Sequence, residues 1–220
     1  MFTGLIKQRG RVASIARRGE FAEITVEWES EPPAIEVGDS ISINGVCLTV
    51  TKLSGRAFYL DVSFETLSKT TLGKLSAGER VNLETPLTPS DGFHGHIVLG
   101  HIDGMGEVVS VIEREGVRVI RISYPGELAP YLAVKGSIAV EGVSLTINEV
   151  DKGSFTVVII PHTSRATTLG EKKKGDKVNL EADVIARYIE RQLAVFGKGI
   201  KGTEEKRELT IEDLKEKGYL

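Results

Sequence analysis

Two short segments carry thiol and hydroxyl groups in the same alternating pattern. Cys47 and Thr49 alternate with the apolar residues of 46–50, and Ser144 and Thr146 take the same places in 143–147. Alternate side chains of a β-strand point to opposite faces, so each segment is expected to present one apolar and one polar face. Such a face of small hydrogen-bonding groups either meets water or lines a ligand pocket. A small buried cysteine beside a strand-forming threonine gives the same pattern, and the alternation leaves both interpretations open.

Three of the four histidines lie within eight residues, at His94, His96 and His101. A neutral imidazole beside a ligand accepts or donates a proton near physiological pH, which makes this segment a candidate for acid–base chemistry. Clustered imidazoles also bind metal ions, but no carboxylate or cysteine lies at a telling spacing, so no metal is expected. A loop of solvent-exposed histidines is the alternative.

Asp183 precedes an amphipathic segment and has two compatible roles. Its carboxylate can accept a backbone N–H as the N-cap of a helix, or it can accept a ligand hydroxyl and assist proton transfer. Lys135 is most simply a solvated surface residue. Glu65 and His162 occupy equivalent places in the two halves of the chain, and position alone assigns them no chemistry.

These residues belong to a chain that repeats itself at a spacing of 97 residues. Residues 38–85 align with 135–182 without a gap and with 17 identities in 48 positions, so the chain contains an internal duplication, which should be recognised before anything else. A duplicated domain predicts two similar pockets, and the positions at which the copies differ are candidates for divided chemistry. The repeated motifs are Gly45-Val46-Cys47-Leu48-Thr49 with Gly142-Val143-Ser144-Leu145-Thr146, Thr70-Thr71-Leu72-Gly73 with Thr167-Thr168-Leu169-Gly170, and Val81-Asn82-Leu83-Glu84 with Val178-Asn179-Leu180-Glu181.

Both copies show the pattern of short strands. The alternating segments are β-branched and separated by turn residues every 8–12 positions, which favours a small closed barrel or a sandwich in each copy. We place copy one at 1–93 and copy two at 94–190. After residue 184 apolar residues recur every three to four positions, which predicts an amphipathic helix over 184–197 that ends at Gly197. Residues 198–220 form a charged tail, with a second short helix expected from Thr210.

The composition excludes several classes of protein. The net charge is −3, whereas a nucleic-acid partner usually requires a strongly basic face. No apolar run is long enough to span a membrane, and the single cysteine cannot form an internal disulfide, so a cytoplasmic protein is expected. Dinucleotide, P-loop and nucleophile-elbow motifs are also missing from the sequence. The residues alone therefore predict a duplicated β-barrel with two polar pockets, without a substrate.

The repeated motifs, together with the start Met1-Phe2-Thr3-Gly4 and the segments Gly95-His96 and Gly100-His101-Ile102, resemble riboflavin synthase of the alpha-chain type over about residues 1–195. The resemblance implies an all-β fold of two tandem six-stranded Greek-key barrels, with a C-terminal helix that builds a homotrimer. It implies a dismutation of two 6,7-dimethyl-8-ribityllumazine molecules that uses no metal or external cofactor. One molecule gives up a four-carbon unit and leaves as 5-amino-6-(ribitylamino)uracil, and the other becomes riboflavin.

Carried over by position, the resemblance assigns residues to two sites, which are formed where the first barrel of one subunit faces the second barrel of the next. His101 is the leading candidate for proton transfer at the C7 methyl group of a lumazine, and Cys47, Ser144 and Asp183 are candidates to assist addition of a nucleophile at C7. The site of the first barrel contains Cys47, Leu48, Thr49, Asp61, Val62, Ser63, Phe64, Glu65, Thr66, Gly100, His101 and Ile102, with Lys135 approaching it. The site of the second barrel contains Gly4, Leu5, Ile6, Ser144, Leu145, Thr146, Val158, Ile159, Ile160, Pro161, His162 and Thr163.

Two departures lie beside the second site. Glu141 stands where many relatives carry aspartate, and His162-Thr163-Ser164 stands where a Glu-Thr-Leu run is commoner. The nearest alternative to an enzyme is a binding protein of the same fold, of the lumazine-protein type, that holds a flavin or lumazine without converting it. A flavin-dependent reductase is a more distant alternative, and the missing nicotinamide motif argues against it.

Overall fold

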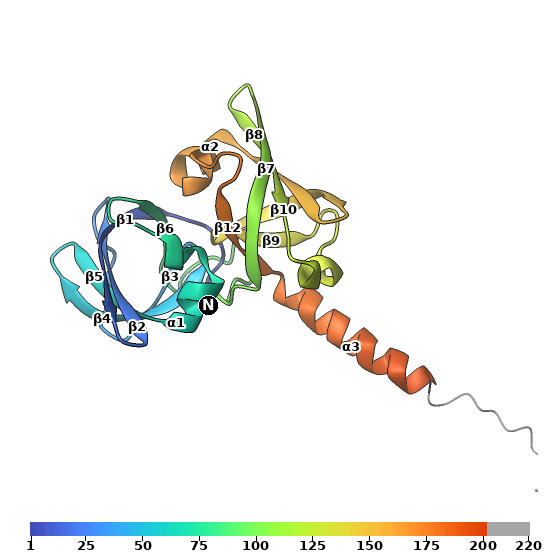
Figure 1. Cartoon of the computed structure of the whole chain (residues 1–220), viewed down its shortest axis with the longest axis horizontal. Helices are drawn as coiled ribbons and strands as arrows, with labels where there is room; N and C mark the ends of the chain where they lie inside the picture. The colour runs from blue at the N-terminus through green and yellow to red at the C-terminus, as the bar shows by residue number, and fades with distance from the viewer. Residues whose placement is uncertain (202–220) are drawn as a thin grey trace, which may run out of the picture.

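The computed structural model describes residues 1–201 and shows two closed barrels joined side by side, with a helix that projects away from them (Figure 1). The first barrel has six antiparallel strands in the order β1-β2-β5-β4-β3-β6. Two short helical turns connect β5 to β6. The elements are β1 Gln8–Arg18, β2 Phe21–Trp28, β3 Ser40–Ile43, β4 Val46–Ser54, β5 Ala57–Ser63, α1 Phe64–Lys69, η1 Thr71–Lys74 and β6 Arg80–Glu84.

The second barrel repeats the first, with the strand order β10-β11-β8-β7-β12-β9. The prediction of two six-stranded barrels is therefore confirmed. The copies differ between their second and third strands, where copy two contains the additional 3₁₀ turn η2. Its elements are β7 Gly104–Arg114, β8 Val117–Ser123, η2 Gly126–Tyr131, β9 Ser137–Val140, β10 Val143–Asp151, β11 Ser154–Ile159, α2 Pro161–Ala166, η3 Thr168–Gly170 and β12 Lys177–Ala182.

Each barrel has its own apolar core, filled from alternate positions of its strands. In β4 the predicted apolar face is buried, with exposed fractions of 4%, 8% and 1% for Val46, Leu48 and Val50, whereas Thr49 is exposed. Phe58 fills the first core and Phe155 fills the second. A third, smaller cluster of Phe2, Val98 and Ala139 lies between the barrels and packs against Cys47.

Two asparagines hold the barrels together through reciprocal hydrogen bonds. Asn82 Oδ1 accepts the N–H of Thr168 at 2.8 Å, and Asn82 Nδ2 donates to the carbonyl of Glu141 at 2.9 Å. Asn179 makes the matching bonds to the N–H of Thr71 at 2.7 Å and the carbonyl of Asn44 at 2.9 Å. Both side chains are fully buried, so these bonds satisfy peptide groups that water does not reach.

The helix α3, Val184–Lys201, begins where the amphipathic pattern predicted. Asp183 caps it, because its Oδ1 accepts the N–H of Ile185 at 2.9 Å. The expected end at Gly197 is wrong, since the helix continues to Lys201. Glycine disfavours a helix interior by about 1 kcal/mol without ending the helix. The expected helix from Thr210 and the part of the charged tail after 201 lie outside the described residues.

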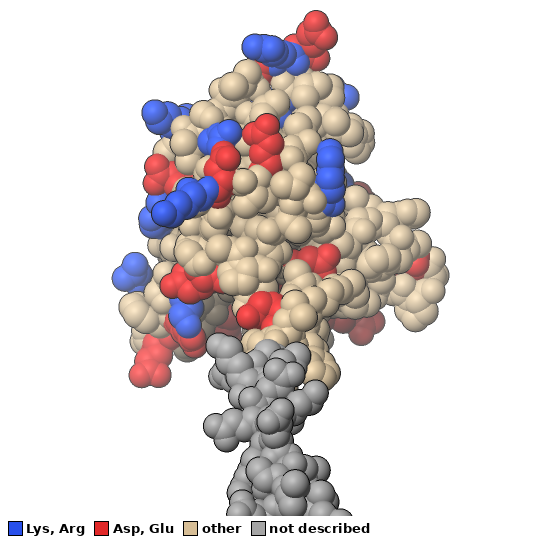
Figure 2. Space-filling model, turned by 90° about the vertical axis from the view of Figure 1, so that its right-hand side faces the viewer, with Lys and Arg blue, Asp and Glu red and all other residues tan. Residues whose placement is uncertain are grey.

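The outer surface carries mixed charge. Basic and acidic side chains are interspersed over the face shown in Figure 2. Ion pairs join the barrels as well, because the carboxylate of Glu171 in copy two lies 2.8 Å from the guanidinium of Arg80 and 3.4 Å from that of Arg9. Among the helices described, none combines the length and apolar character that a membrane span requires.

Replacing Asn179 with alanine is expected to lower the free energy of unfolding by about 3 kcal/mol, because the N–H of Thr71 and the carbonyl of Asn44 lose their buried partner. Urea unfolding monitored by tryptophan fluorescence measures the change. Asn148→Ala is the matched control, since Asn148 is only partly buried, and it should cost less than about 1 kcal/mol. Equal losses in the two variants would contradict a structural role for the asparagine pair.

Candidate active site

In the first barrel β4 and β5 pair along only part of their length, and we call the two strand edges that this leaves unpaired the first cleft. The two strands pair from Val50 opposite Leu60 to Ser54 opposite Ala57. In the described structure residues 46–49 pair only with β3, and residues 61–63 pair only with β2. Strand edges without a neighbour present unpaired N–H and C=O groups. The predicted residues of 47–49 and 61–63 therefore lie on these two unpaired edges.

In the second barrel the corresponding strands also pair along only part of their length, and their unpaired edges form the second cleft. β10 and β11 pair from Ile147 opposite Val157 to Asp151 opposite Ser154. Within the described chain residues 143–146 pair only with β9, and residues 158–159 pair only with β8. The predicted residues of 144–146 and 158–160 therefore flank an equivalent cleft, which begins at Ser144 as the first cleft begins at Cys47.

A short helix starts at the end of each cleft. Ser63 caps α1, because its Oγ accepts the N–H of Thr66 at 3.1 Å. Phe64 is 67% exposed. Glu65 is paired with Lys69 at 2.6 Å, and this hydrogen bond holds the pKa of the Glu65 carboxyl below its usual value. Proline begins α2, and His162 in its first turn is exposed.

Two segments, 2–6 and 98–102, cross between the barrels, and we call them the crossing segments. They pair antiparallel through Phe2 and Val98. The carbonyl of Gly4 accepts the N–H of Ser144 at 2.8 Å, and the carbonyl of Gly100 accepts the N–H of Cys47 at 3.0 Å. Each segment therefore reaches the first residues of the cleft in the other copy.

Glycine is required at both of these contacts. A Cβ atom on Gly4 would lie 2.6 Å from the Cβ of Ser144, and one on Gly100 would lie 2.4 Å from the Cβ of Cys47. Both glycines also have positive φ angles, of 76° and 81°, which side-chain-bearing residues rarely adopt. The predicted groupings of Gly4 with Ser144 and of Gly100 with Cys47 thus follow from close backbone contact.

The isoleucines of the crossing segments also pack against the barrel of the other copy. Ile6 is 8% exposed and belongs to the core of the second barrel. Ile102 packs against the core of the first barrel. Leu5, which precedes Ile6, is 39% exposed and His101, which precedes Ile102, is also exposed. The imidazole of His101 is therefore presented to solvent next to the peptide bond that contacts Cys47.

His96 supplies a contact that sequence reasoning missed. Its Nδ1 lies 2.7 Å from the Oγ of Ser144. Burial lowers the pKa of the His96 imidazole, while the charge of Asp183 acts in the opposite direction. The other ring nitrogen is buried and has no hydrogen-bond partner among the described residues. The sequence marked His96 as part of a histidine cluster, but nothing in the local pattern linked it to a serine 48 residues away.

Lys135 lies in copy two, where its N–H donates to the carbonyl of Ile147 at 2.8 Å. Within one chain it therefore flanks the strand of Ser144 and Thr146, and not the strand of Cys47. Its φ angle of 67° places it in a tight turn before β9. Asp183 combines its capping role with an electrostatic influence on His96, so its two proposed roles are compatible in this geometry.

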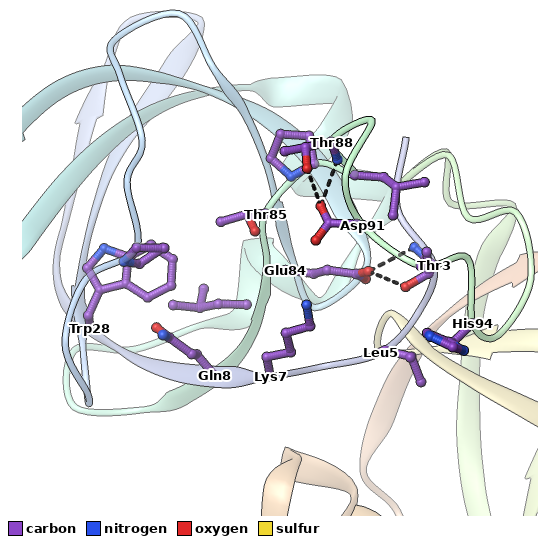
Figure 3. A pocket seen from close by; sticks show the side chains of 15 residues that line it. Thr3, Leu5, Lys7, Gln8, Trp28, Glu84, Thr85, Thr88, Asp91 and His94 are labelled. Carbon is purple, nitrogen blue, oxygen red and sulfur yellow. Dashed lines mark hydrogen bonds between the residues drawn. The ribbon is translucent and has the colours of Figure 1, made fainter.

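Two buried glutamates hold the crossing segments. Glu84 accepts the N–H and hydroxyl of Thr3 at 2.8 and 2.9 Å and the N–H of Gly4 at 3.1 Å, as Figure 3 shows for Thr3. Glu181 accepts the N–H groups of Leu99 at 2.7 Å and Gly100 at 2.9 Å. Burial raises the pKa of both carboxyls, that of Glu181 to about 7.

A cavity of about 460 Å³ lies beside the segment that joins the copies, and Leu5, a residue predicted for the second site, is part of its lining (Figure 3). Glu84 and Thr3 form part of its wall, and Trp28 lies at its far side. In copy two the chain after the last strand forms α3 instead, which contacts η2 where Arg187 pairs with Asp103 and lies over the ring of Tyr131.

The lumazine binding domain family matches the chain twice, over residues 3–86 and 99–183. The barrels with their paired clefts are therefore lumazine-binding domains. Riboflavin synthase of Actinobacillus pleuropneumoniae is 42% identical over 219 residues, and that of Photobacterium phosphoreum is 40% identical over 221 residues, each match covering 100% of both chains. The chain belongs to the riboflavin synthase family, and it is accordingly an enzyme of the transferase class.

Solved structures of the same fold include LumP complexed with 6,7-dimethyl-8-(1'-D-ribityl) lumazine. That structure superposes with a TM-score of 0.74 at 26% sequence identity, covering 83% of this chain and 99% of LumP. About a sixth of this chain has no counterpart in the LumP structure.

The pKa of Glu181 predicts how stability depends on pH. In the unfolded chain a glutamate titrates near 4.5, whereas burial raises the folded value to about 7, with a further increase from the charge of Asp103. The folded protein therefore retains a proton that the unfolded chain has released. This contribution, about 3 kcal/mol, is complete below pH 4.5 and is lost as the pH rises through 7. Arg187, which pairs with Asp103, is the nearby cation.

Urea unfolding of the wild type and of Glu181→Gln at pH 5 and pH 8 measures this effect, since glutamine does not titrate. Relative to Glu181→Gln, the wild type should lose about 3 kcal/mol of its free energy of unfolding between pH 5 and pH 8. Glu27→Gln, at an exposed strand position, is the control and should show no such shift. A difference for Glu181→Gln that does not change with pH would contradict the raised pKa.

Proposed function

We propose that this protein catalyses the dismutation of two 6,7-dimethyl-8-ribityllumazine molecules into riboflavin and 5-amino-6-(ribitylamino)uracil. The observation that carries the proposal is the pair of equivalent clefts with different polar groups, Cys47 in one and Ser144 with His96 in the other. Two identical substrates require two similar sites, and unequal roles require that the sites differ. Holding the molecules together supplies much of the rate acceleration in such a reaction.

Each copy, 1–93 and 94–190, is proposed to bind one lumazine. The open strand edges offer peptide N–H and C=O groups, which match the alternating donors and acceptors of the pyrimidinedione ring. The exposed hydroxyls of Thr49 and Thr146 and the helix starts at 63–66 and 160–163 suit the ribityl chain. We propose that the residues assigned to the two sites by the resemblance line these two binding sites.

The chemical groups fall into two sets. In the second site the neutral His96 can accept the proton of the Ser144 hydroxyl, which activates that oxygen or a water molecule for addition at C7. In the first site the Cys47 thiol occupies the equivalent place, and the exposed His101 is proposed to transfer a proton at the acidic C7 methyl group. Asp183, which acts on His96 electrostatically, favours the protonated imidazole that this step creates. The four-carbon unit of the donor then moves to the acceptor, and the donor leaves as the aminouracil.

The functional form is proposed to be a cytoplasmic homotrimer built through α3. The helix extends away from both barrels (Figure 1), and its apolar stripe of Ile185, Ile189, Leu193 and Phe196 is 55–67% exposed. A stripe of this size favours association with the same helix of other subunits. In a trimer Lys135 and the second site of one subunit would face the first site of its neighbour, as the resemblance implies.

A carrier of lumazine or flavin without turnover is the second candidate. The similarity to the ligand-bound LumP structure favours it, because that fold holds a lumazine. The higher identity to riboflavin synthases, over the whole chain, favours the enzyme.

Anaerobic incubation of the purified protein with 6,7-dimethyl-8-ribityllumazine alone, followed by chromatography, tests the proposal. Riboflavin and 5-amino-6-(ribitylamino)uracil are expected in equal amounts, because each turnover converts one substrate into each product. Recovery of tightly bound, unchanged lumazine would instead identify a carrier.

The Cys47→Ala and Ser144→Ala variants provide the controls. Each removes one candidate group from one site, so each should reduce product formation at least tenfold, whereas Thr51→Ala, an exposed position on the same strand as Cys47, should retain the wild-type rate. Full activity in either site variant would remove that group from the proposed chemistry.

The double variant Ile189→Glu and Leu193→Glu is expected to be monomeric and to lose turnover, because it places two charges in the apolar stripe of α3. Sedimentation equilibrium gives the mass. Arg191→Gln with Ala194→Glu changes the net charge equally on the opposite face of the helix and should remain trimeric and active. A monomeric wild type, or a monomeric variant with full activity, would contradict the proposed trimer.

A further inference from the structure

Each buried glutamate and the cleft that depends on it lie in different barrels. Glu84 ends β6 of the first barrel and accepts hydrogen bonds from Thr3 and Gly4. The carbonyl of Gly4 in turn accepts the N–H of Ser144 in the second barrel. Glu181 lies in β12 of the second barrel and binds Leu99 and Gly100, whose carbonyl accepts the N–H of Cys47 in the first barrel. The arrangement is the same in both directions.

We propose that Glu84 and Glu181 are positioning residues, each of which sets the geometry of the pocket in the other barrel. They are 9% and 3% exposed, and each carboxylate accepts at least two N–H groups of one crossing segment. Removing a bond therefore frees a segment whose next contact is the first residue of a cleft. The importance of these pockets for catalysis rests on the proposed function, but the mechanical link does not.

A second line of contacts supports the crossed assignment. Ile6, two residues after Gly4, is buried in the core of the second barrel, and Ile102, two residues after Gly100, packs against the core of the first. Each crossing segment is thus anchored at one end by a glutamate of its own copy and at the other by the apolar core of the opposite copy. Movement at the glutamate is transmitted toward the opposite cleft, because the carbonyl of the intervening glycine is hydrogen-bonded to the N–H of Ser144 or Cys47.

Glutamine is the appropriate replacement for these carboxylates. It has nearly the same shape, but only one of its two terminal groups can accept a hydrogen bond. At Glu181 the amide NH₂ would face the N–H of Leu99 or Gly100, and at Glu84 it would face Thr3 or Gly4. At each glutamine, one hydrogen bond to the crossing segment is then replaced by a contact between two donors, which leaves a buried N–H without a partner.

The single cysteine of the chain reports on the first pocket. Cys47 is partly buried against Phe2 and Val98, so its rate of reaction with a thiol reagent such as 5,5′-dithiobis(2-nitrobenzoate) depends on the seating of the 98–102 segment. The Glu181→Gln variant is expected to react at least five times faster than the wild type. The Glu84→Gln variant should accelerate the reaction less than Glu181→Gln does, because the segment that Glu84 holds reaches Cys47 only through the side chain of Phe2, whereas Gly100 bonds the peptide N–H of Cys47 directly.

The imidazole of His96 reports on the second pocket, because its Nδ1 is bonded to Ser144 Oγ. In ¹⁵N-histidine-labelled protein the His96 signals, assigned by comparison with His96→Gln, are expected to shift in Glu84→Gln and to stay unchanged in Glu181→Gln. Should either glutamine variant fail to fold, the corresponding aspartate variant, whose shorter side chain also breaks one bond, is used in its place. Thermal unfolding monitors folding throughout.

The crossed pattern of both readouts supports the proposal. Equal effects of the two variants on Cys47, an effect confined to the barrel that contains the substituted glutamate, or no effect on either probe would overturn it. Neither probe requires turnover, so these outcomes are separate from the product test of the proposed function. If the wild type converts lumazine, the rates of the two variants show in addition whether the crossed loss appears in kcat or in KM.

Discussion

Each pocket depends on peptide hydrogen bonds that the opposite half of the chain supplies. The N–H groups of Cys47 and Ser144 point out of their strands toward the clefts, and they are satisfied by the carbonyls of Gly100 and Gly4. A buried peptide group without a partner is costly, so neither pocket is complete in an isolated barrel. Although each barrel has its own apolar core, the two halves of the chain form one structural unit.

The sequence predicted what depends on local pattern. Alternation along β4 and β10 is a property of neighbouring residues, and so is the cap of α3 at Asp183, which is why both follow from the sequence. The exchange of the crossing segments has no local pattern, because Gly4 and Gly100 look like ordinary loop glycines until their distances to Ser144 and Cys47 are known. The same reason hides the contact of His96 with Ser144 and the roles of Glu84 and Glu181, which the sequence showed only as members of a repeated motif.

The copies differ where their chemistry is proposed to differ. The hydroxyl of Ser144 has an imidazole partner, whereas the thiol of Cys47 packs against apolar side chains. At the interface Asn44 of the first copy is matched by Glu141 of the second, whose buried carboxylate lies 3.1 Å from the ammonium group of Lys172. After the last strand, copy one continues into the linker beside a cavity, and copy two continues into α3. These differences lie around a shared frame of strands and asparagine bonds that is nearly identical in both halves.

The crossing segments also carry information about ancestry. Two identical single-barrel chains related by a two-fold axis would exchange their N-terminal segments in this same way, each finishing the other's cleft. Joining them through a linker preserves every exchanged contact and frees each half to mutate alone. Because both copies lie in one chain, each molecule carries Cys47 at one exchanged contact and Ser144 at the other in a fixed ratio of one to one, a difference that two identical chains cannot have.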